Sequence, residues 1–343
     1  MNKNSGEHSS KPKFVGLLLS VMMLSRWGVP AYAQGAATTP LNNMSNSSLS
    51  ATGLEKFDFF YAGEAKQRNM FIIRKGKIAW SYSDTSGRGE ISDAILMKNG
   101  NVLFAHQFGV TLINQRKEVI WHHEAPEGFE IHTAQLIDRE HVVFVQNGNP
   151  AKVCVMNMKT NRLETEFVIP FKSGTHGQIR HARLTAAGTL LIAHMDLGKV
   201  CEYDIEGRTV SALNVPGVWS AVPLKNGHML VTSNQSVQEL TSSGEVTWDC
   251  RLSAISDYKI TSPQLAVRLS NGNTLINNWF NEWSSKLDVN KLPAQAIEVT
   301  PQMKTVWVLR SWTGEAKLGP STTIQIINKQ TDEVNGDHFG YIK

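Results

Sequence analysis

The chain has 343 residues, 34 of them lysine or arginine and 30 aspartate or glutamate, and its formal net charge is +4. Three of these four net charges fall within the first 33 residues, so the remainder is almost neutral and gives no electrostatic basis for binding nucleic acid or an anionic membrane. The cysteines Cys154, Cys201 and Cys250 are odd in number and lie in apolar or alternating runs, so we expect buried structural side chains rather than a disulfide framework.

Residues 1–33 have the pattern of an export signal. Lys3, Lys11 and Lys13 precede an apolar run over residues 14–24, and small residues at 31 and 33 suit a signal peptidase that cleaves before Gln34. The run is too short to cross a bilayer as a helix, and no second apolar segment follows. We therefore expect a periplasmic or secreted protein without a membrane span.

The mature chain is predicted to begin with a flexible leader. Residues 34–54 are mostly Ala, Thr, Ser and Asn, a composition that buries too little apolar surface to order itself. Residues 55–343 are predicted to form one domain.

A unit of about 40 residues recurs along this domain. Its clearest part is an apolar run, an Asn-Gly turn and a second apolar run, found at 93–104, 220–231 and 265–276, with weaker copies at 133–144 and 181–192. Asn-Gly between two apolar runs favours a β-hairpin, because both residues tolerate a positive φ.

Each unit continues with a turn and a β-rich run that usually ends in a large aromatic residue. The residue is tryptophan in four units (Trp80, Trp121, Trp248 and Trp307) and phenylalanine in a fifth, Phe167, whereas the run 207–213 has none. We interpret these aromatic side chains as packing residues that fill the space between neighbouring sheets, not as a cofactor site.

Two hairpins per unit predict a four-stranded sheet, and sheets of this size in series predict a β-propeller. Five inner strands begin near residues 93, 133, 181, 220 and 265, and the sixth is the run 321–327. That last strand has too few residues after it to complete a sheet, while the segment 57–80 has outer strands and no inner one. The sequence therefore predicts an all-β, six-bladed propeller closed by one blade that contains both chain ends.

The blade motifs also carry a resemblance to known proteins. They are Asn-Gly-Asn-Val-Leu-Phe (99–104), Gly-Glu-Val-Thr-Trp (244–248), Asn-Gly-Asn-Thr-Leu-Ile-Asn-Asn-Trp (271–279), Val-Trp-Val-Leu-Arg-Ser-Trp (306–312) and Leu-Gly-Pro (318–320). With these motifs the chain resembles secreted β-propellers of the PQQ-like (quinoprotein-like) superfamily, and more loosely the bacterial arylsulfotransferases. The resemblance implies the fold from about residue 57 onward and no catalytic residue, because such folds host many activities.

The loops that enter the inner strands of a propeller gather on one face, around the central channel. Aligning the units on their turns places six residue pairs there: Ser92/Asp93, His132/Thr133, Arg180/His181, Trp219/Ser220, Gln264/Leu265 and Ser321/Thr322. The candidate catalytic residues are His132, His181 and Arg180. The candidate ligand-binding residues are Asp93, His106, His194, Asp196, Trp219, Gln264, Asn277, Trp279, Glu282 and Trp283.

This ring of residue types favours a small-molecule or oligosaccharide ligand. Tryptophan rings stack on sugar faces, amide and carboxylate side chains pair with hydroxyl groups, and Arg180 suits a carboxylate or sulfate. Each residue also has a structural alternative: the histidines as hydrogen-bonded channel residues, Trp279 and Trp283 as packing for a long insertion, and Arg180 as a partner of a structural acid such as Asp93. A divalent metal held by the histidines is a further alternative, although their spacing matches no metal motif.

Three functions follow from this site. The first is binding, with or without processing, of an extracellular carbohydrate. The second is a polysaccharide lyase that uses a channel histidine as its base and Arg180 to neutralise a uronate. The third is a protein-interaction scaffold, with a protein partner in place of the sugar. The residues do not decide whether the protein is an enzyme, and no cofactor is identified.

Overall fold

The structure is a computed structural model that describes residues 52–63, 68–85, 88–172, 174–255, 258, 260–280, 293–327 and 331–333. All of them belong to one of the two units into which the chain divides, Ser45–Lys343. The predicted export signal and the predicted leader as far as residue 51 lie outside the described residues, as do Glu282 and Trp283.

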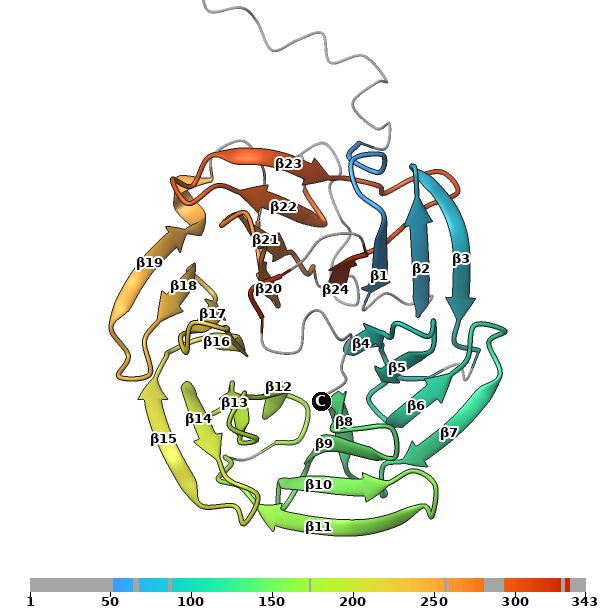
Figure 1. The fold of residues 1–343 in the computed structure, drawn as a ribbon, viewed down its shortest axis with the longest axis vertical. Helices are drawn as coiled ribbons and strands as arrows, with labels where there is room; N and C mark the ends of the chain where they lie inside the picture. Colours follow the sequence, from blue (N-terminus) through green and yellow to red (C-terminus); the bar gives the residue numbers. More distant parts are fainter. Residues whose placement is uncertain are drawn as a thin grey trace, which may run out of the picture. The chain divides into compact units, whose positions relative to one another are not determined.

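The strands form six four-stranded antiparallel sheets, which are the predicted blades (Figure 1). Blade 1 contains β4 (Asp93–Leu96), β5 (Val102–Ala105), β6 (Gly109–Ile113) and β7 (Val119–Glu124). Blade 2 contains β8 (Glu130–Leu136), β9 (His141–Asn147), β10 (Lys152–Asn157) and β11 (Arg162–Val168). Blade 3 contains β12 (Ile179–Leu184), β13 (Leu190–His194), β14 (Lys199–Tyr203) and β15 (Thr209–Asn214).

The second half of the ring repeats this order. Blade 4 contains β16 (Val218–Pro223), β17 (Met229–Ser233), β18 (Ser236–Leu240) and β19 (Val246–Arg251). Blade 5 contains β20 (Ala266–Arg268), β21 (Thr274–Asn277), β22 (Ala296–Val299) and β23 (Thr305–Leu309). Blade 6 contains β24 (Ser321–Ile326), β1 (Phe59–Gly63), β2 (Asn69–Arg74) and β3 (Lys77–Ser83). A single 3-10 turn, Leu252–Ala254, interrupts the strand pattern of the described chain.

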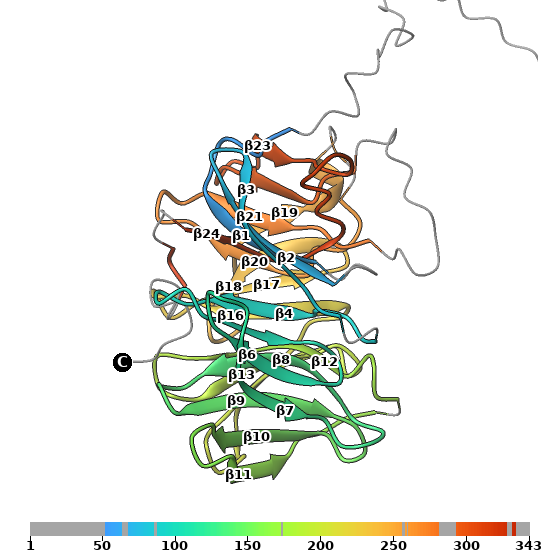
Figure 2. The same ribbon diagram turned by 90° about the vertical axis from the view of Figure 1, so that its right-hand side faces the viewer.

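Blade 6 confirms the predicted closure by both chain ends. β24 supplies its inner strand and pairs antiparallel with β1, so that Phe59 faces Ile326 and Tyr61 faces Ile324. The two strands lie side by side in Figure 1 and Figure 2, blue against dark red. The Tyr61 hydroxyl donates a 2.6 Å hydrogen bond to the carbonyl of Gly319, which ties the segment leading into β24 to the same blade.

Buried apolar side chains form six clusters, one between each pair of neighbouring blades. This placement follows from the sequence, because alternate residues of each strand point to opposite faces of a blade and both faces are covered. Complete burial of one leucine, isoleucine or phenylalanine side chain contributes about 2 kcal/mol, so the blade interfaces hold most of the stabilising surface. Cys154, Cys201 and Cys250 are buried and unpaired, as predicted.

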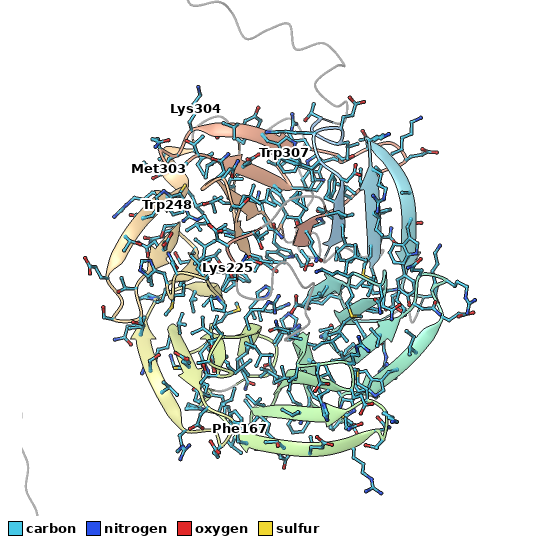
Figure 3. The ribbon with its side chains drawn as sticks, in the orientation of Figure 1. Phe167, Lys225, Trp248, Met303, Lys304 and Trp307 are labelled. Atoms are coloured by element: carbon cyan, nitrogen blue, oxygen red, sulfur yellow. The ribbon has the colours of Figure 1, made fainter. Side chains whose placement is uncertain are left out.

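The outer-strand aromatic residues contact the turn between the third and fourth strands of the next blade. The indole N–H groups of Trp80, Trp121 and Trp248 donate to Gln115, Asn161 and Pro301, at 3.0, 3.2 and 2.8 Å. Figure 3 shows Trp248 beside the turn that contains Met303. Trp307 donates at 2.9 Å to the carbonyl of Gly53, ahead of β1, and so continues the series into blade 6. The predicted packing role of these tryptophans is confirmed.

The described chain end returns to the ring after β24. Thr331 forms an isolated bridge with Leu269 in blade 5, and Glu333 forms one with Leu224 in blade 4. The segment therefore links the ends of two innermost strands. Among the described residues, no helix is long and apolar enough to cross a membrane.

Candidate functional site

Three consecutive blades carry a β-bulge at the same place in their innermost strand. The pairing register shifts between Ile131 and Ala134 in β8, between Ile179 and His181 in β12, and between Val218 and Ser220 in β16. A bulge leaves a residue out of the ladder and re-aims its side chain. The residues concerned include His132, Arg180 and Trp219, which the sequence alignment places at the channel entrance.

A cavity of about 690 Å³ opens at this position. Its walls come from three segments and two loops around the innermost strands. The segments are those before β4, before β12 and after β21, and the loops are β5–β6 and β13–β14. Strands β12 and β16 contribute one residue each. The lining residues are Arg88, Gly89, Glu90, Gln107, Phe108, His176, Gly177, Arg180, Met195, Trp219 and Trp279. Of the predicted site residues, the structure therefore brings Arg180, Trp219 and Trp279 to one cavity.

The two tryptophans lie together on one side of it. Their ring centroids are 6.0 Å apart and their planes meet at 44°. The indole N–H of Trp219 donates to Asn234 at 2.6 Å. That of Trp279 is buried and has no acceptor among the described residues. An unpaired buried donor on an aromatic wall is a group that a polar ligand can satisfy.

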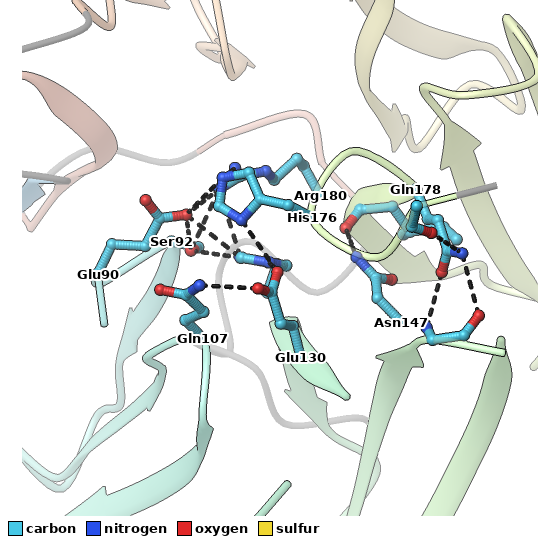
Figure 4. A network of polar contacts seen from close by, with 12 residues as sticks. Glu90, Ser92, Gln107, Glu130, Asn147, His176, Gln178 and Arg180 are labelled. Atoms are coloured by element: carbon cyan, nitrogen blue, oxygen red, sulfur yellow. Dashed lines mark hydrogen bonds and ion pairs between the residues drawn. The ribbon is translucent and has the colours of Figure 1, made fainter. Parts of the chain in front are cut away.

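Other lining residues belong to a network of polar and charged side chains (Figure 4). Arg180 forms an ion pair with Glu90 through Nη1, and its Nη2 lies 2.6 Å from Nε2 of His176. Nδ1 of His176 lies 2.9 Å from the carboxylate of Glu130, which also meets Nε2 of His132 at 2.7 Å. Glu130 therefore joins the two imidazoles.

These contacts determine which ring nitrogens carry hydrogen. The carboxylate of Glu130 can only accept when ionised, so His176 donates from Nδ1 and His132 donates from Nε2. Nδ1 of His132 is then free to accept from the hydroxyl of Ser92 at 2.8 Å and from Arg180 at 3.3 Å. Nε2 of His176 is the corresponding acceptor toward Arg180. Both imidazoles are thus held in the neutral form.

The electrostatics agree with this assignment. Burial, together with the nearby Arg180 charge, lowers the pKa of His132 to about 4. Although burial raises the pKa of Glu130, hydrogen bonds from His132, His176 and Gln107 hold it well below its ordinary value. At neutral pH Glu130 is therefore ionised and His132 is neutral, next to the guanidinium of Arg180.

Three of these residues also have the geometry of a metal site. One oxygen of Glu90, one nitrogen of His132 and one of His176 lie within 4.8 Å of one another. The Arg180 guanidinium, however, contacts the Glu90 carboxylate, Nδ1 of His132 and Nε2 of His176. A divalent ion and this guanidinium would compete for the same donors, so the residues do not fit a metal while Arg180 is in place.

Asp93 has a different role from the predicted one. Its two carboxylate oxygens accept from the two Nη atoms of Arg183, both at 2.8 Å, and one also accepts from Thr133 at 2.8 Å. The structural alternative for Arg180, a pair with a buried acid, is met by Glu90. Asp93 instead links blades 1, 2 and 3.

The other predicted residues are not among those that line the cavity. His181 is fully buried, neither ring nitrogen has a hydrogen-bond partner among the described residues, and burial lowers its pKa to about 3. His106 contacts Thr111 and His194 contacts Tyr203, each at 3.0 Å. Asp196 accepts from the backbone of residue 172, and Gln264 and Asn277 are buried.

Sequence reasoning missed Glu90, Glu130 and His176. Glu90 precedes Ser92 by two positions, and Glu130 precedes His132 by two. Extended residues two apart point the same way, so the repeat contains a signal for both carboxylates. His176 lies in the connection before β12, where neither repeat nor periodicity marks it.

Comparison with known proteins supports the fold and goes no further. No family model matches the chain, and no curated protein does. A structure of a protein of unknown function from Bacteroides caccae is 23% identical with a TM-score of 0.67, covering 78% of this chain and 98% of the other. A catalytically inactive virginiamycin B lyase from Staphylococcus aureus, with quinupristin, is 11% identical with a TM-score of 0.52 and covers 76% and 87%. The WD40 propeller domain of Doa1 is 12% identical with a TM-score of 0.50 and covers 65% and 73%.

Proposed function

We propose that this protein binds a carbohydrate in the cavity at the channel mouth, outside the cytoplasm. The observation that carries the proposal is the composition of the cavity: Trp219 and Trp279 form one side, and Gln107, His176 and Arg180 contribute polar groups. A sugar has apolar C–H faces that pack on aromatic rings and hydroxyl groups at its edges, so it needs both kinds of wall. A volume of about 690 Å³ lies within the usual range for small-ligand sites.

Export is part of the proposal, and the thiols are consistent with it. Burial raises the pKa of Cys154 to about 12 and that of Cys250 to about 11. Because the thiolate is the reactive form, such cysteines resist oxidation and disulfide exchange. The odd number of cysteines is therefore compatible with an oxidising compartment. Cleavage before Gln34 is checked by N-terminal sequencing of protein exported from its natural host.

The binding proposal is tested by calorimetric titration of the mature protein with neutral and acidic oligosaccharides. We expect Trp219→Ala and Trp279→Ala each to weaken binding about fivefold, since one lost aromatic contact is worth about 1 kcal/mol and about 1.4 kcal/mol is a factor of ten. Trp80→Ala, on the outer strand of blade 6, is the matched control and should bind normally. Circular dichroism confirms that each variant is folded.

Two results would count against the proposal. One is the absence of binding to every sugar tested, which would leave the protein-interaction scaffold as the better hypothesis. The other is equal affinity of the Trp219→Ala and Trp80→Ala variants, which would move the ligand away from the cavity. Running each titration with and without a chelator separates a sugar that binds alone from one that binds through a metal.

A further inference from the structure

His176 is placed unlike the other histidines of this region. Its side chain is 54% exposed and lines the cavity, whereas the His132 side chain is fully buried. Among the described residues it is the only histidine in the cavity wall. Because Nδ1–H is donated to Glu130, the lone pair of the neutral ring is on Nε2. An imidazole oriented by a carboxylate is the arrangement of a general base, once a ligand takes the place of Nε2 at Nη2 of Arg180.

Glu130 is suited to hold that imidazole in place. It is anchored on its far side by His132 at 2.7 Å and by Gln107 at 2.8 Å, so it cannot easily rotate away. Its negative charge also stabilises the imidazolium that forms when Nε2 takes a proton. Glu130 is therefore a positioning residue for His176, because it does not line the cavity itself.

Arg180 indicates the class of substrate. Its guanidinium lines the cavity, and Nη2 lies 2.6 Å from Nε2 of His176. A ligand carboxylate that took Nη2 as its donor would bring its own α-hydrogen next to the basic nitrogen. Arg88, whose side chain is 58% exposed and pairs with Glu124, places a second guanidinium in the same wall. Because a guanidinium donates to a carboxylate through several N–H groups at once, these two side chains suit an acidic sugar better than a neutral one.

The carboxylates do not suit glycoside hydrolysis. That reaction uses two carboxyl groups on opposite sides of the scissile bond, roughly 5 to 9.5 Å apart. Among the described residues that line the cavity, Glu90 is the only carboxylate, and it is paired with Arg180. A reaction that needs one base and one cation fits the site better.

We propose that, if the cavity binds carbohydrate as argued above, it cleaves a uronate-containing polysaccharide by β-elimination with His176 as the base. The uronate carboxylate displaces His176 from Nη2 of Arg180, and Nε2 of His176 accepts the proton α to that carboxylate. The electrons of the C–H bond form a C=C bond while the bond from the β-carbon to the glycosidic oxygen breaks. The leaving oxygen takes a proton from water, and His176 returns its proton to water. No oxidant, reductant or other co-reactant is consumed.

The first experiment incubates the mature protein with polygalacturonate, alginate and hyaluronan, with dextran as the neutral control. The elimination product is a conjugated unsaturated uronate, which is followed by its ultraviolet absorbance. Binding is measured separately by calorimetry on the same samples. We expect absorbance to rise with one of the acidic polymers and not with dextran, and the rate to persist in chelator.

The variants then separate catalysis from structure. His176→Gln should keep its affinity within about threefold and lose at least a hundredfold in rate, the usual contribution of a general base. His228→Gln is the matched control, because His228 pairs with Glu239 at 2.8 Å in the turn between β16 and β17 and does not line the cavity. It should cleave at the normal rate.

Glu130→Gln tests the positioning role through a pH profile. The charged groups that face His176 are Glu90, Glu130 and Arg180, with neutral His132 behind them. Without the Glu130 charge the imidazolium is less stable, so the acid limb of the rate profile should move to lower pH while the rate falls. A fall in rate with no movement of the acid limb would contradict the role given to Glu130.

The outcomes also distinguish this inference from the binding proposal. An acidic polymer that binds and yields no unsaturated product overturns the elimination and leaves carbohydrate binding intact. Cleavage by His176→Gln at the normal rate overturns the role of His176. Cleavage that chelator abolishes would replace the Arg180 mechanism with a metal-dependent one. A failure of every polymer to bind overturns the proposed function and this inference with it.

Discussion

Asp93 and Arg183 form a buried ion pair that connects blades on either side of blade 2. The carboxylate is 1% exposed and the Arg183 side chain 13%, and both of their hydrogen bonds are 2.8 Å. Although burial raises the pKa of Asp93, the charge and hydrogen bonds of Arg183, with smaller effects of His181 and Thr133, together leave it below its ordinary value. Asp93→Ala therefore leaves a buried guanidinium without its bidentate partner.

Breaking a buried pair in this way costs about 3 to 5 kcal/mol of unfolding free energy. The carboxylate of Glu333 also acts on Arg183 and raises its pKa, so part of the charge stays compensated and we expect the lower value, about 3 kcal/mol. The double variant Asp93→Ala/Arg183→Leu removes both charges. It should cost much less than the two single variants added together, because no uncompensated charge remains.

Urea unfolding, followed by tryptophan fluorescence and by circular dichroism, measures this coupling. With an m-value of about 3 kcal/mol/M, the Asp93→Ala midpoint should fall by about 1 M. Coincident curves from the two probes are required before free energies are compared. The reasoning is refuted by single-variant costs that simply add in the double variant, or by an Asp93→Ala midpoint equal to that of the wild type.

Three further results are expected. Burial lowers the pKa of His132 and of His194 from 6.5 to about 4. Between these two pH values the unfolded state binds more protons than the folded state, so the unfolding free energy should fall from pH 6.5 to pH 4 by up to about 3 kcal/mol for each histidine. A melting temperature that does not change over that range would contradict this. Gly207→Ala should lower the unfolding free energy by about 2 to 3 kcal/mol, because φ is +81° and the new Cβ would lie 2.7 Å from the ring of Phe167. Gly227→Ala has a similar φ of +83° but open space around the new Cβ, so it should cost about 1 kcal/mol. Denaturation of both variants compares the two costs directly. Truncation after Pro320 removes β24 and should prevent folding, which soluble yield and near-ultraviolet circular dichroism would report.

The sequence predicted the fold almost completely because the fold is a repeat. The Asn-Gly turns and the outer-strand tryptophans identify the blades independently of one another. A unit whose strands are weakly marked can therefore be assigned by alignment with the other units. The incomplete segments at the two ends then required a shared blade, which the pairing of Phe59 with Ile326 confirms. Local periodicity and chain order were sufficient for this part.

The candidate site was predicted less well, for a physical reason. The alignment identified the bulged positions and so found Arg180 and Trp219. It could not show that His132 and His181 are buried, since bulges direct neighbouring residues to different depths. His176 belongs to a connection outside the repeat, and its relation to Glu130 exists only after blades 2 and 3 pack together. Contacts between blades cannot be predicted from the sequence pattern of a single blade.

The blade that contains both chain ends also shows how the chain could be circularly permuted. Phe59 begins β1 and Ile326 ends β24, and the two residues are paired across these antiparallel strands, so a short hairpin turn can join them. The turn at residues 98–100, between β4 and β5, would then be a natural place for new termini. A circularly permuted chain would have to build blade 1 from two ends in place of blade 6. The stability of this permuted chain would show whether the ring requires both chain ends in blade 6 in particular, or only in one blade.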